Sequence, residues 1–445
     1  MRIKLARGTF VRYCGDECVV WCPRTGGCSI LRSANVIVKA IGRDAISVEA
    51  VAKYTSKALD CSVQEARDAV EFVLKEMGRQ HFVEVEMDGN EQNDYGDKQE
   101  LPLEREDDDS YTPIADFFRK YKIPQELHID LTNACNERCV HCYHPSHALR
   151  HLSLEIVFKL LDEFRAIQGV TVHLTGGECM LHPDFRKICE RCVRLNINMI
   201  VMTNLTNCDS DMIRFLKHVD PQFLNVSLYS MKADEHDAIT GIRGSWHRTM
   251  DAILACEKAG VHIRIATPLL RINRNAFADL KRFTQEHHMH LIPSAEIVAK
   301  SNHDCDNLVY ACSPQEFCEV ACKDKELFDD GWGAERCAGD KVCSIGLSRL
   351  YVNSKGDYYP CDSMHEYVLG NVATHTLEAV WRGEKLEYLR GLKNRDFGKC
   401  ATCKDRPWCK LCPAANFNAT GDMFKIPPGR CEMARVVHKV YGKDR

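Results

Sequence analysis

The chain has 445 residues, of which 45% are hydrophobic and 27% are charged, and its formal net charge is −4. This length is sufficient for one barrel-sized domain with smaller additions, and the near-neutral charge argues against a general nucleic-acid binder. The charged N-terminus is not followed by an apolar run, and no stretch of about 18 apolar residues occurs, so we expect a cytoplasmic protein with neither a secretory signal nor a membrane helix.

Residues 1–87 are expected to form a small α+β domain. Ser62 precedes an amphipathic helical pattern, and Glu65 follows it with the spacing of a capping box. Two runs of strand-forming residues flank a short turn, which is typical of a hairpin. The predicted strands are Phe10–Tyr13 and Cys18–Trp21, which form the hairpin, and Phe82–Met87.

Residues 88–112 are polar and acidic and include the run Asp107–Asp109. Such a run is typical of a solvated linker. Binding of a partner protein is the alternative interpretation of the run.

Residues 113–300 alternate between strand and helix patterns. This alternation predicts parallel βα units, hence an α/β fold with a TIM-like barrel, complete or partial, built from six such units. The predicted strands are Leu127–Leu131, Val170–Leu174, Met199–Met202, Phe223–Leu228, Val261–Pro268 and His290–Ile292.

Residues 301–445 are irregular in pattern and rich in cysteine. The whole chain has 25 cysteines, and dense cysteine in a long intracellular chain indicates metal or redox chemistry more often than disulfides. A fold of short elements held together by metal suits this composition.

Three cysteines follow the first predicted barrel strand with the spacing C-x3-C-x2-C, at Cys135, Cys139 and Cys142. Soft thiolates select zinc or iron–sulfur clusters. Three ligands on a four-iron cube leave one iron open to an external ligand. A three-cysteine zinc site and unliganded thiols are the alternatives.

This segment resembles the signature of the radical S-adenosylmethionine (SAM) superfamily, C-x3-C-x-aromatic-C, with His141 at the ring position. The resemblance implies that SAM binds the open iron and is cleaved to a 5′-deoxyadenosyl radical. Gly176-Gly177-Glu178 at the next strand end is similar to the motif that holds the SAM amino group in that family, although Cys179 stands where many members have proline.

Two later strand ends continue the resemblance. Asn204 and Ser227 correspond to positions that contact the ribose and carboxylate of SAM in this family. A lone Asn or Ser at a strand end is more often a turn or cap residue. All these positions lie at carboxyl ends of strands, where barrels of this kind place their sites.

Eight C-terminal cysteines match the number needed for two four-thiolate sites, which by count alone could hold two zinc ions. Their arrangement resembles the SPASM domain of many radical SAM enzymes, although the last spacing of the central block is x2 rather than x3. The resemblance implies three 4Fe-4S clusters in the whole chain. The implied ligands are Cys337, Cys343, Cys361 and Cys412 for auxiliary cluster I, and Cys400, Cys403, Cys409 and Cys431 for auxiliary cluster II.

Asp362 directly follows Cys361 and resembles the aspartate that acts as a base in anaerobic sulfatase-maturing enzymes. The role implied is removal of a proton from a substrate group during radical oxidation. An ordinary turn or capping aspartate is the alternative.

The N-terminal region resembles the PqqD-like, winged-helix-like domain that binds leader peptides of ribosomally made precursors as an added strand. DNA binding by such a domain is the alternative, which the weak charge disfavours. Two further cysteine groups are expected to be outside the clusters. For Cys14, Cys18, Cys22 and Cys28, unliganded thiols are favoured and an additional metal site is the alternative; Cys305, Cys312, Cys318 and Cys322 could be resolving thiols or a redox pair.

Together these features predict a radical SAM peptide maturase whose partners are a precursor peptide and an electron donor such as flavodoxin or ferredoxin. Thioether cross-linking is the leading interpretation. Carbon–carbon bond formation, dehydrogenation, epimerisation and sulfatase-maturing-type oxidation of a side chain are alternatives. A peptide- or DNA-binding module that uses metal only for structure is the alternative from another class.

Overall fold

The computed structural model describes residues 1–23, 26–86, 108–329, 332–333, 337, 339–364 and 367–442, and of residues 108–113 only the backbone. The chain divides into two compact units, Met1–Ile123 with Asn196–Asn198, and Pro124–Leu195 with Met199–Arg445. Each unit is described here by itself.

The first unit contains two antiparallel three-stranded sheets, ordered β5-β1-β6 and β2-β3-β4. The predicted hairpin is confirmed, because β2 pairs with β3 from Phe10 opposite Trp21 to Cys14 opposite Glu17. The elements are β1 (Arg2–Leu5), β2 (Phe10–Cys14), β3 (Glu17–Trp21), β4 (Cys28–Arg32), α1 (Asn35–Ala40), β5 (Ile46–Ser47), α2 (Val48–Leu59), α3 (Val63–Arg79), β6 (Val83–Glu86) and α4 (Asp108–Lys120).

Helix α3 begins with the predicted capping box. The Ser62 hydroxyl accepts from the backbone N–H of Glu65 at 3.2 Å, and the Glu65 carboxylate accepts from the backbone N–H of Ser62 at 2.9 Å. These two bonds satisfy donors that a helix start leaves unpaired. The apolar faces of the helices and sheets then share a core that includes Ile3, Val20 and Met77.

Helix α4 begins at Asp108, inside the segment 88–112 that the sequence predicts to be a linker. This finding corrects the C-terminal bound of that linker. Acidic residues favour a helix N-terminus because they complement its positive end. The part of the predicted linker before Asp108, and residue Asp107 of the acidic run, lie outside the described residues.

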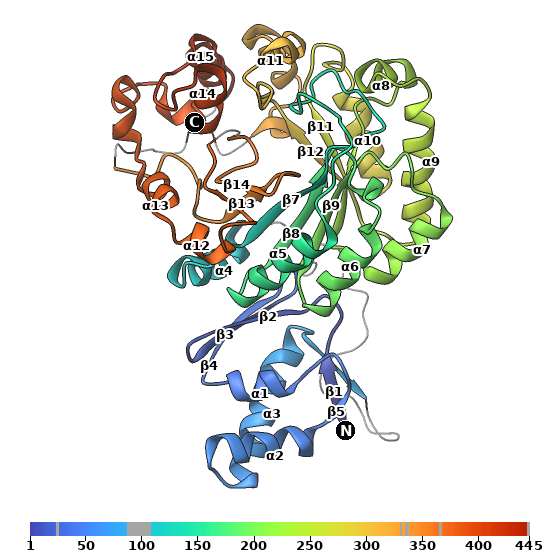
Figure 1. Cartoon of the computed structure of the whole chain (residues 1–445), viewed down its shortest axis with the longest axis vertical. Helices are drawn as coiled ribbons and strands as arrows, with labels where there is room; N and C mark the ends of the chain where they lie inside the picture. Colours follow the sequence, from blue (N-terminus) through green and yellow to red (C-terminus); the bar gives the residue numbers. More distant parts are fainter. Residues whose placement is uncertain are drawn as a thin grey trace. The chain divides into compact units, whose positions relative to one another are not determined.

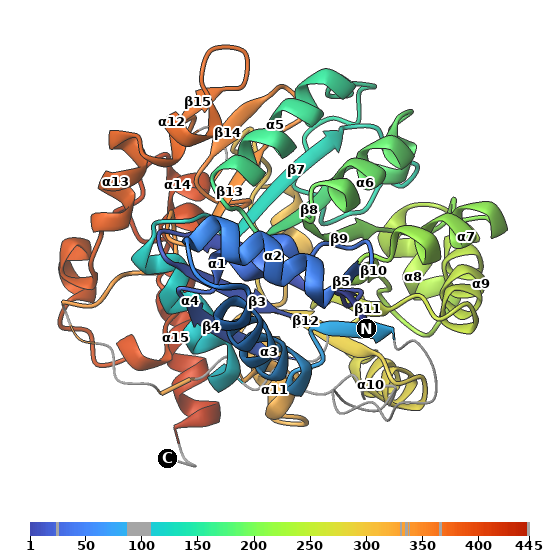
Figure 2. The ribbon, with the colours of Figure 1, turned by 90° about the horizontal axis from the view of Figure 1, so that it is seen from below.

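The second unit is built on a nine-stranded sheet of order β12-β11-β10-β9-β8-β7-β13-β14-β15. All six predicted barrel strands are present and parallel, and helices lie on the outer side of their curve (Figures 1 and 2). The elements are β7 (Glu126–Thr132), α5 (Leu154–Ala166), β8 (Thr171–Gly176), α6 (Phe185–Arg194), β9 (Asn198–Thr203), α7 (Ser210–Val219), β10 (Phe223–Ser227), α8 (Ala233–Thr240), α9 (Ser245–Lys258), β11 (Ile263–Pro268), α10 (Phe277–Glu286) and β12 (His290–Ser294).

The cysteine-rich region extends the same sheet. β13 pairs in parallel with β7, with Arg349 opposite Glu126, and a tight antiparallel hairpin then leads to β14. This pairing carries the chain after β14, with Cys361 and Asp362, alongside the first barrel strand. The elements of this region are α11 (Pro314–Ala321), β13 (Arg349–Val352), β14 (Asp357–Tyr359), β15 (Gly370–Asn371), α12 (Leu377–Trp381), α13 (Glu384–Gly391), α14 (Pro413–Thr420) and α15 (Pro428–Tyr441), with short 3-10 turns between them.

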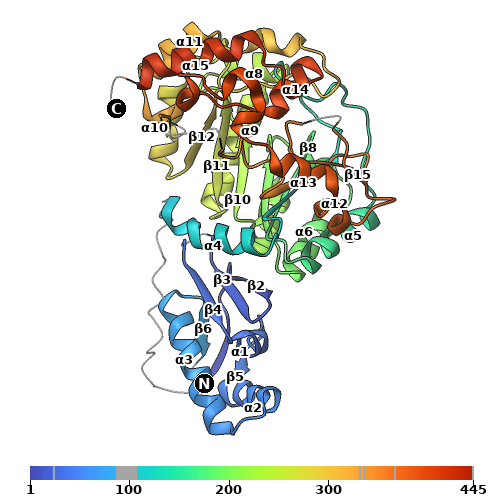
Figure 3. The same cartoon turned by 90° about the vertical axis from the view of Figure 1, so that its left-hand side faces the viewer.

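Helices α11 and α15 lie side by side (Figure 3) and bury a separate apolar cluster that includes Phe317, Phe328 and Val437. The cluster also includes Leu269 and Phe277, so the region packs against the barrel through apolar residues in addition to its cysteines. Among the described residues, none of the helices combines the length and apolar character that crossing a bilayer requires.

Candidate functional site

One cavity, about 290 Å³ in volume, brings together most of the residues that the sequence singles out. It lies at the carboxyl ends of the barrel strands, as expected for this fold. Its lining includes Cys135, Cys139, His141, Cys142, Gly176, Gly177, Asn204, Ser227, Tyr229 and Asp362.

The loop that carries the three cysteines is held against helix α8. The backbone N–H of Arg138 donates to the Thr240 carbonyl at 2.8 Å, and that of Val140 donates to the Ile239 carbonyl at 2.9 Å. These bonds fix the loop after β7 independently of any bound group. The three thiols therefore line the cavity from a loop that is already positioned.

The thiols are protonated when no metal is bound. Burial raises the pKa of Cys135 to about 11, and it also raises the pKa values of Cys139 and Cys142. Cys139 lies 3.5 Å from the Glu137 carboxylate and 3.7 Å from the Tyr229 hydroxyl. Binding of a thiophilic metal would displace these protons, since thiolates are the ligands.

The two glycines let strand β8 approach the cysteine loop closely. Gly176 has φ +123°, and a Cβ on Gly177 would lie 2.3 Å from the Ala134 carbonyl oxygen. The same carbonyl accepts from the backbone N–H of Glu178 at 2.8 Å. Side chains at these positions would therefore push the loop and its cysteines out of place.

Glu178 is only 1% exposed and is not one of the residues that line the cavity. Its carboxylate accepts from the Thr203 hydroxyl at 2.9 Å, from the backbone N–H of Asn204 at 2.8 Å and from that of Met180 at 3.0 Å. Burial raises the pKa of this carboxyl. In this geometry Glu178 fixes the end of β9, and its contact with SAM stays a prediction.

Several buried polar atoms around the cavity lack a hydrogen-bond partner among the described residues. They include His141 Nδ1, Glu137 Oε1 and His144 Nε2. Burial lowers the pKa of His141 to about 4, so its ring is neutral, and it packs edge-on against Tyr229 with centroids 5.1 Å apart. Soft thiol donors together with such unpaired groups fit an iron–sulfur cluster and a polar cofactor.

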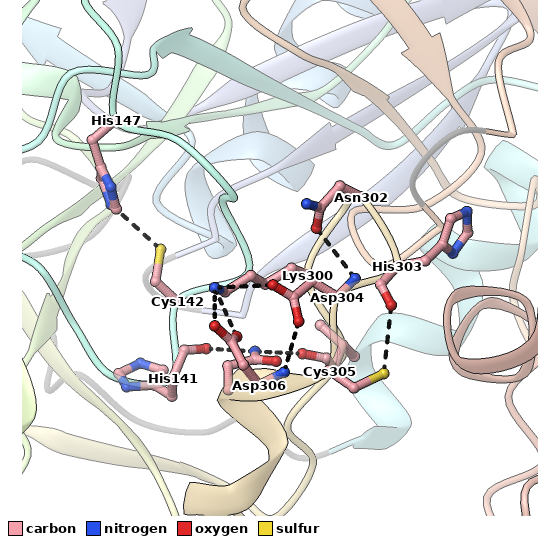
Figure 4. A network of polar contacts seen from close by, with 11 residues as sticks. His141, Cys142, His147, Lys300, Asn302, His303, Asp304, Cys305 and Asp306 are labelled. Atoms are coloured by element: carbon pink, nitrogen blue, oxygen red, sulfur yellow. Dashed lines mark hydrogen bonds and ion pairs between the residues drawn. The ribbon is translucent and has the colours of Figure 1, made fainter.

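Figure 4 shows the chain around the last cysteine of the loop. Cys142 Sγ lies 3.7 Å from His147 Nε2, and the Lys300 ammonium bridges Asp304 and Asp306 at 3.8 and 2.7 Å. The His141 carbonyl also accepts from the Asn307 side chain at 3.2 Å. The hydrogen bond from Asn307 anchors the loop to the segment that follows β12.

Asp362 lines the same cavity, although it comes from the cysteine-rich region. Its carboxylate accepts from the Cys361 thiol at 3.1 Å. Burial, the largest single influence, would raise the pKa of Asp362, but attraction to His128 and Arg349 outweighs it and lowers the pKa. An ionised carboxylate therefore faces the space beside the three cysteines.

The proposed ligands of auxiliary cluster II meet in a second cavity. This cavity, about 220 Å³, has a lining that includes Cys400, Cys403, Cys409 and Cys431 together with Arg406, Arg430 and Arg435. Four thiols with three guanidinium groups beside them suit a cluster whose net charge is negative.

For auxiliary cluster I, Cys412 lies close enough to Cys361 and Cys343 for charge on these sulfur atoms to affect their pKa values. Burial raises the pKa of Cys412 to about 11. Cys337 is exposed, and its backbone N–H donates to Asp340 at 2.6 Å. Within the described residues, no contact places Cys337 with the other three, so its role as a ligand stays a prediction.

The remaining cysteine groups are not part of the linings of these two cavities. In the first unit Cys18 and Cys22 are buried, and burial raises the pKa of Cys14 and Cys28 to about 11 each. In the second unit Cys318 of α11 and Cys322, the residue that caps its C-terminus, have sulfur atoms 3.9 Å apart. Their roles stay as predicted from the sequence.

Sequence reasoning missed three features of the cavity wall. Glu137 lies between the first two cysteines and is 2% exposed in the structure. Its position as an acidic residue inside the cysteine motif was a signal that the sequence contained. His128 and Tyr351 also line the cavity. Nothing in the sequence could reveal that β13 brings Tyr351 there, because that pairing joins distant segments.

Comparison with known proteins identifies two family matches in this chain. The family model of the Radical SAM superfamily matches residues 129–284, and that of the iron–sulfur cluster-binding SPASM domain matches residues 343–412. These matches support binding of SAM and of iron–sulfur clusters.

Among curated proteins, the AdoMet-dependent heme synthase of Methanosarcina barkeri is 25% identical over 338 residues, which are 68% of this chain and 95% of that protein. The mycofactocin maturase MftC of Mycolicibacterium smegmatis is 26% identical over 337 residues, covering 72% and 85%. Among solved structures, Streptococcus suis SuiB bound to precursor peptide SuiA shares the fold over 97% of this chain and 100% of that chain, with a TM-score of 0.59 and 14% identity.

Proposed function

We propose, given that this chain is a radical SAM enzyme carrying a SPASM domain, that it matures a ribosomally made precursor peptide and most readily installs a thioether cross-link. The observation that carries the proposal is the extent of the shared fold. SuiB, whose structure contains a precursor peptide, matches 97% of this chain, whereas the alignment with the M. barkeri heme synthase covers 68%. About a third of this chain thus has no counterpart in that alignment.

The proposed cofactor ligands follow from the cavity. Cys135, Cys139 and Cys142 would hold the cluster that leaves one iron open, and the eight C-terminal cysteines would hold two more, which makes three 4Fe-4S clusters. The groups proposed to contact SAM are His141, Gly176, Gly177, Glu178, Asn204 and Ser227. When bound, these cofactors would supply a 5′-deoxyadenosyl radical that abstracts hydrogen and would accept the electron left over after bond formation.

The chain's own residues orient the substrate and handle its proton. In thioether formation the peptide loses one hydrogen atom from carbon, one proton from the cysteine thiol and one electron, and a carbon–sulfur bond forms. We assign Asp362 as the acceptor of the thiol proton, because its carboxylate lies in the same cavity as the three cysteines. Glycine backbone and the buried Glu137 and Tyr229 complete the wall and exclude water.

We assign binding of the leader peptide to the first unit. Each of its two sheets has only three strands and therefore two edges. Edge strands expose backbone groups to which an extended peptide adds as a further strand. The electron that starts each turnover would come from a flavodoxin or a ferredoxin.

A second candidate is modification of a heme precursor. The M. barkeri heme synthase is matched over 95% of its own length, which favours a tetrapyrrole substrate in the same barrel. The two candidates predict different dependence on the first unit, since only a leader peptide needs it.

The test is co-expression with each small open reading frame beside the gene, followed by mass spectrometry of the peptide. A thioether peptide lacks two hydrogen atoms and resists thiol alkylation at one cysteine. Unmodified peptides, together with SAM-dependent conversion of an iron porphyrin precursor, would favour the second candidate. Carbon–carbon cross-linking also removes two hydrogens but leaves the cysteine open to alkylation, so the same spectra separate the two bonds.

A further inference from the structure

Three potential metal ligands meet in the barrel interior outside the residues assigned above. Glu126 and His128 are alternate residues of β7, so their side chains share one face of the sheet. The register places His128 opposite His173 of β8. Within the described part of the chain, these three residues form the one set of at least three histidine, cysteine or carboxylate side chains whose ligand atoms all lie within 4.8 Å of one another.

The separations suit a single ion. Glu126 Oε2 lies 3.4 Å from His128 Nε2 and 3.8 Å from His173 Nε2. Bonds of about 2.1 Å arranged tetrahedrally around zinc place neighbouring ligand atoms about 3.4 Å apart. The ligand atoms of the two histidines lie within 4.8 Å of each other, and because their rings stack, coordination of one ion requires the rings to rotate towards it.

Among the described residues, His173 is a buried side chain, 9% exposed, whose ring nitrogens make no hydrogen bond. Its ring stacks on that of His128 with centroids 4.0 Å apart and an angle of 13° between the planes. Buried polar nitrogens normally have a partner, and a metal ion between these rings and Glu126 would provide one.

We propose that Glu126, His128 and His173 bind one first-row divalent metal ion, of which zinc is the representative. Two imidazoles and one carboxylate are a ligand set that such ions prefer, with a fourth position left for water.

The surroundings fit this proposal. Arg349 Nη2 lies 3.2 Å from Glu126 Oε2 and anchors the carboxylate from β13, as groups around metal ligands commonly do. Asp362 interacts through its charge with His128, His173 and Arg349. The site thus has one more carboxylate than guanidinium in its surroundings, which favours binding of a cation.

Such an ion would join β7 to β8 and, through Arg349, to β13. It would therefore stabilise the junction between the barrel and the cysteine-rich region. His128 also lines the cavity that holds the three cysteines, so the ion would lie at the edge of that cavity.

The test measures zinc and iron together in the cluster-reconstituted holoenzyme, after equilibration with Zn²⁺ and removal of free metal under anaerobic conditions. We expect one zinc per chain beyond the iron in the wild type, and loss of that zinc with unchanged iron in His173→Phe and in Glu126→Gln. The matched control is His287→Asn, because His287 lies 2.9 Å from Glu257 in another histidine–carboxylate pair, and this variant should keep its zinc.

X-ray absorption at the zinc edge identifies the atoms bound to zinc in the wild-type protein, so this test does not depend on the folding of any variant. The proposal predicts nitrogen and oxygen ligands at about 2.0–2.1 Å and no sulfur at about 2.3 Å. A holoenzyme that retains no zinc, a sulfur-rich coordination shell, or equal zinc in the wild type and both variants would overturn it.

Discussion

The substitution Gly177→Ala tests the close approach between strand β8 and the cysteine loop. An alanine Cβ would lie 2.3 Å from the Ala134 carbonyl oxygen, and real Cβ contacts stay above 3.0 Å, so the two segments must separate by at least 0.7 Å. This shift strains the 2.8 Å hydrogen bond from the Glu178 N–H to the same carbonyl. It also moves Cys135, the next residue along the loop.

The expected cost follows from these distances. Overpacking of this kind typically destabilises a protein by about 1–3 kcal/mol, which is less than the total stability of an ordinary domain, about 5–15 kcal/mol, so the variant should fold. A misplacement approaching 1 Å in a catalytic site lowers rates by up to about 100-fold. We therefore expect formation of 5′-deoxyadenosine to fall by at least about tenfold while the protein remains folded.

The assay compares the rate of 5′-deoxyadenosine formation and the urea unfolding midpoint in Gly177→Ala and Gly391→Ala. Gly391 is exposed, and nothing lies within 4 Å of a Cβ built on it. The control should behave as the wild type in both measurements. Equal rates in the two variants would refute the claim that glycine at position 177 positions the cluster loop.

Three further predictions follow from the geometry. Cys431→Ser should remove about four irons per chain, one cube, whereas Cys61→Ser should leave the iron content unchanged, as measured by elemental analysis. Asp362→Asn should retain cleavage of SAM but lower peptide product by about 100-fold or more, and the ratio of 5′-deoxyadenosine to product measures this uncoupling; full product formation would remove the base role. Hydrogen bonding from Lys120, the largest influence, lowers the pKa of Glu17 from 4.5 to about 2, so its stabilising contribution is complete above about pH 4.5 and is lost as the pH falls towards 2. Glu17→Gln should therefore flatten the acid side of the stability curve, as followed by circular dichroism against pH, and an identical curve for both proteins would contradict this sign.

The barrel could be predicted from the sequence because its signals are local. Each strand is a short apolar run followed by a helical period, so β7 to β12 were found within two residues or fewer at each end. The cap at Ser62 was predictable for the same reason, since a capping box lies within four consecutive residues.

The extension of the sheet could not be predicted in this way. β13 pairs Arg349 with Glu126, which are far apart in the chain, and its short apolar pattern is not distinctive. Consequently the sequence placed Asp362 next to Cys361 but gave no reason for it to face the barrel cavity. The structure supplies that reason through the β7–β13 pairing.

From the sequence, the cysteines and glycines that line the cavity could be singled out, whereas the hydrogen-bond partners of Glu178 could not. A motif identifies the residue types that the chemistry needs, whereas the partners of a carboxylate depend on folding. Thr203 and the backbone of Asn204 reach Glu178 only because β9 lies beside β8 in the sheet. The His128–His173 stack was missed because two histidines in separate strands reveal nothing until their register is known.

The most direct measurement reconstitutes the protein anaerobically, reduces it with dithionite in the presence of SAM and quantifies 5′-deoxyadenosine. We expect the wild type to form it and the variant with Cys135, Cys139 and Cys142 all replaced by serine to form none. The absence of this product from the wild type, or equal amounts from both proteins, would contradict radical chemistry at these three thiols.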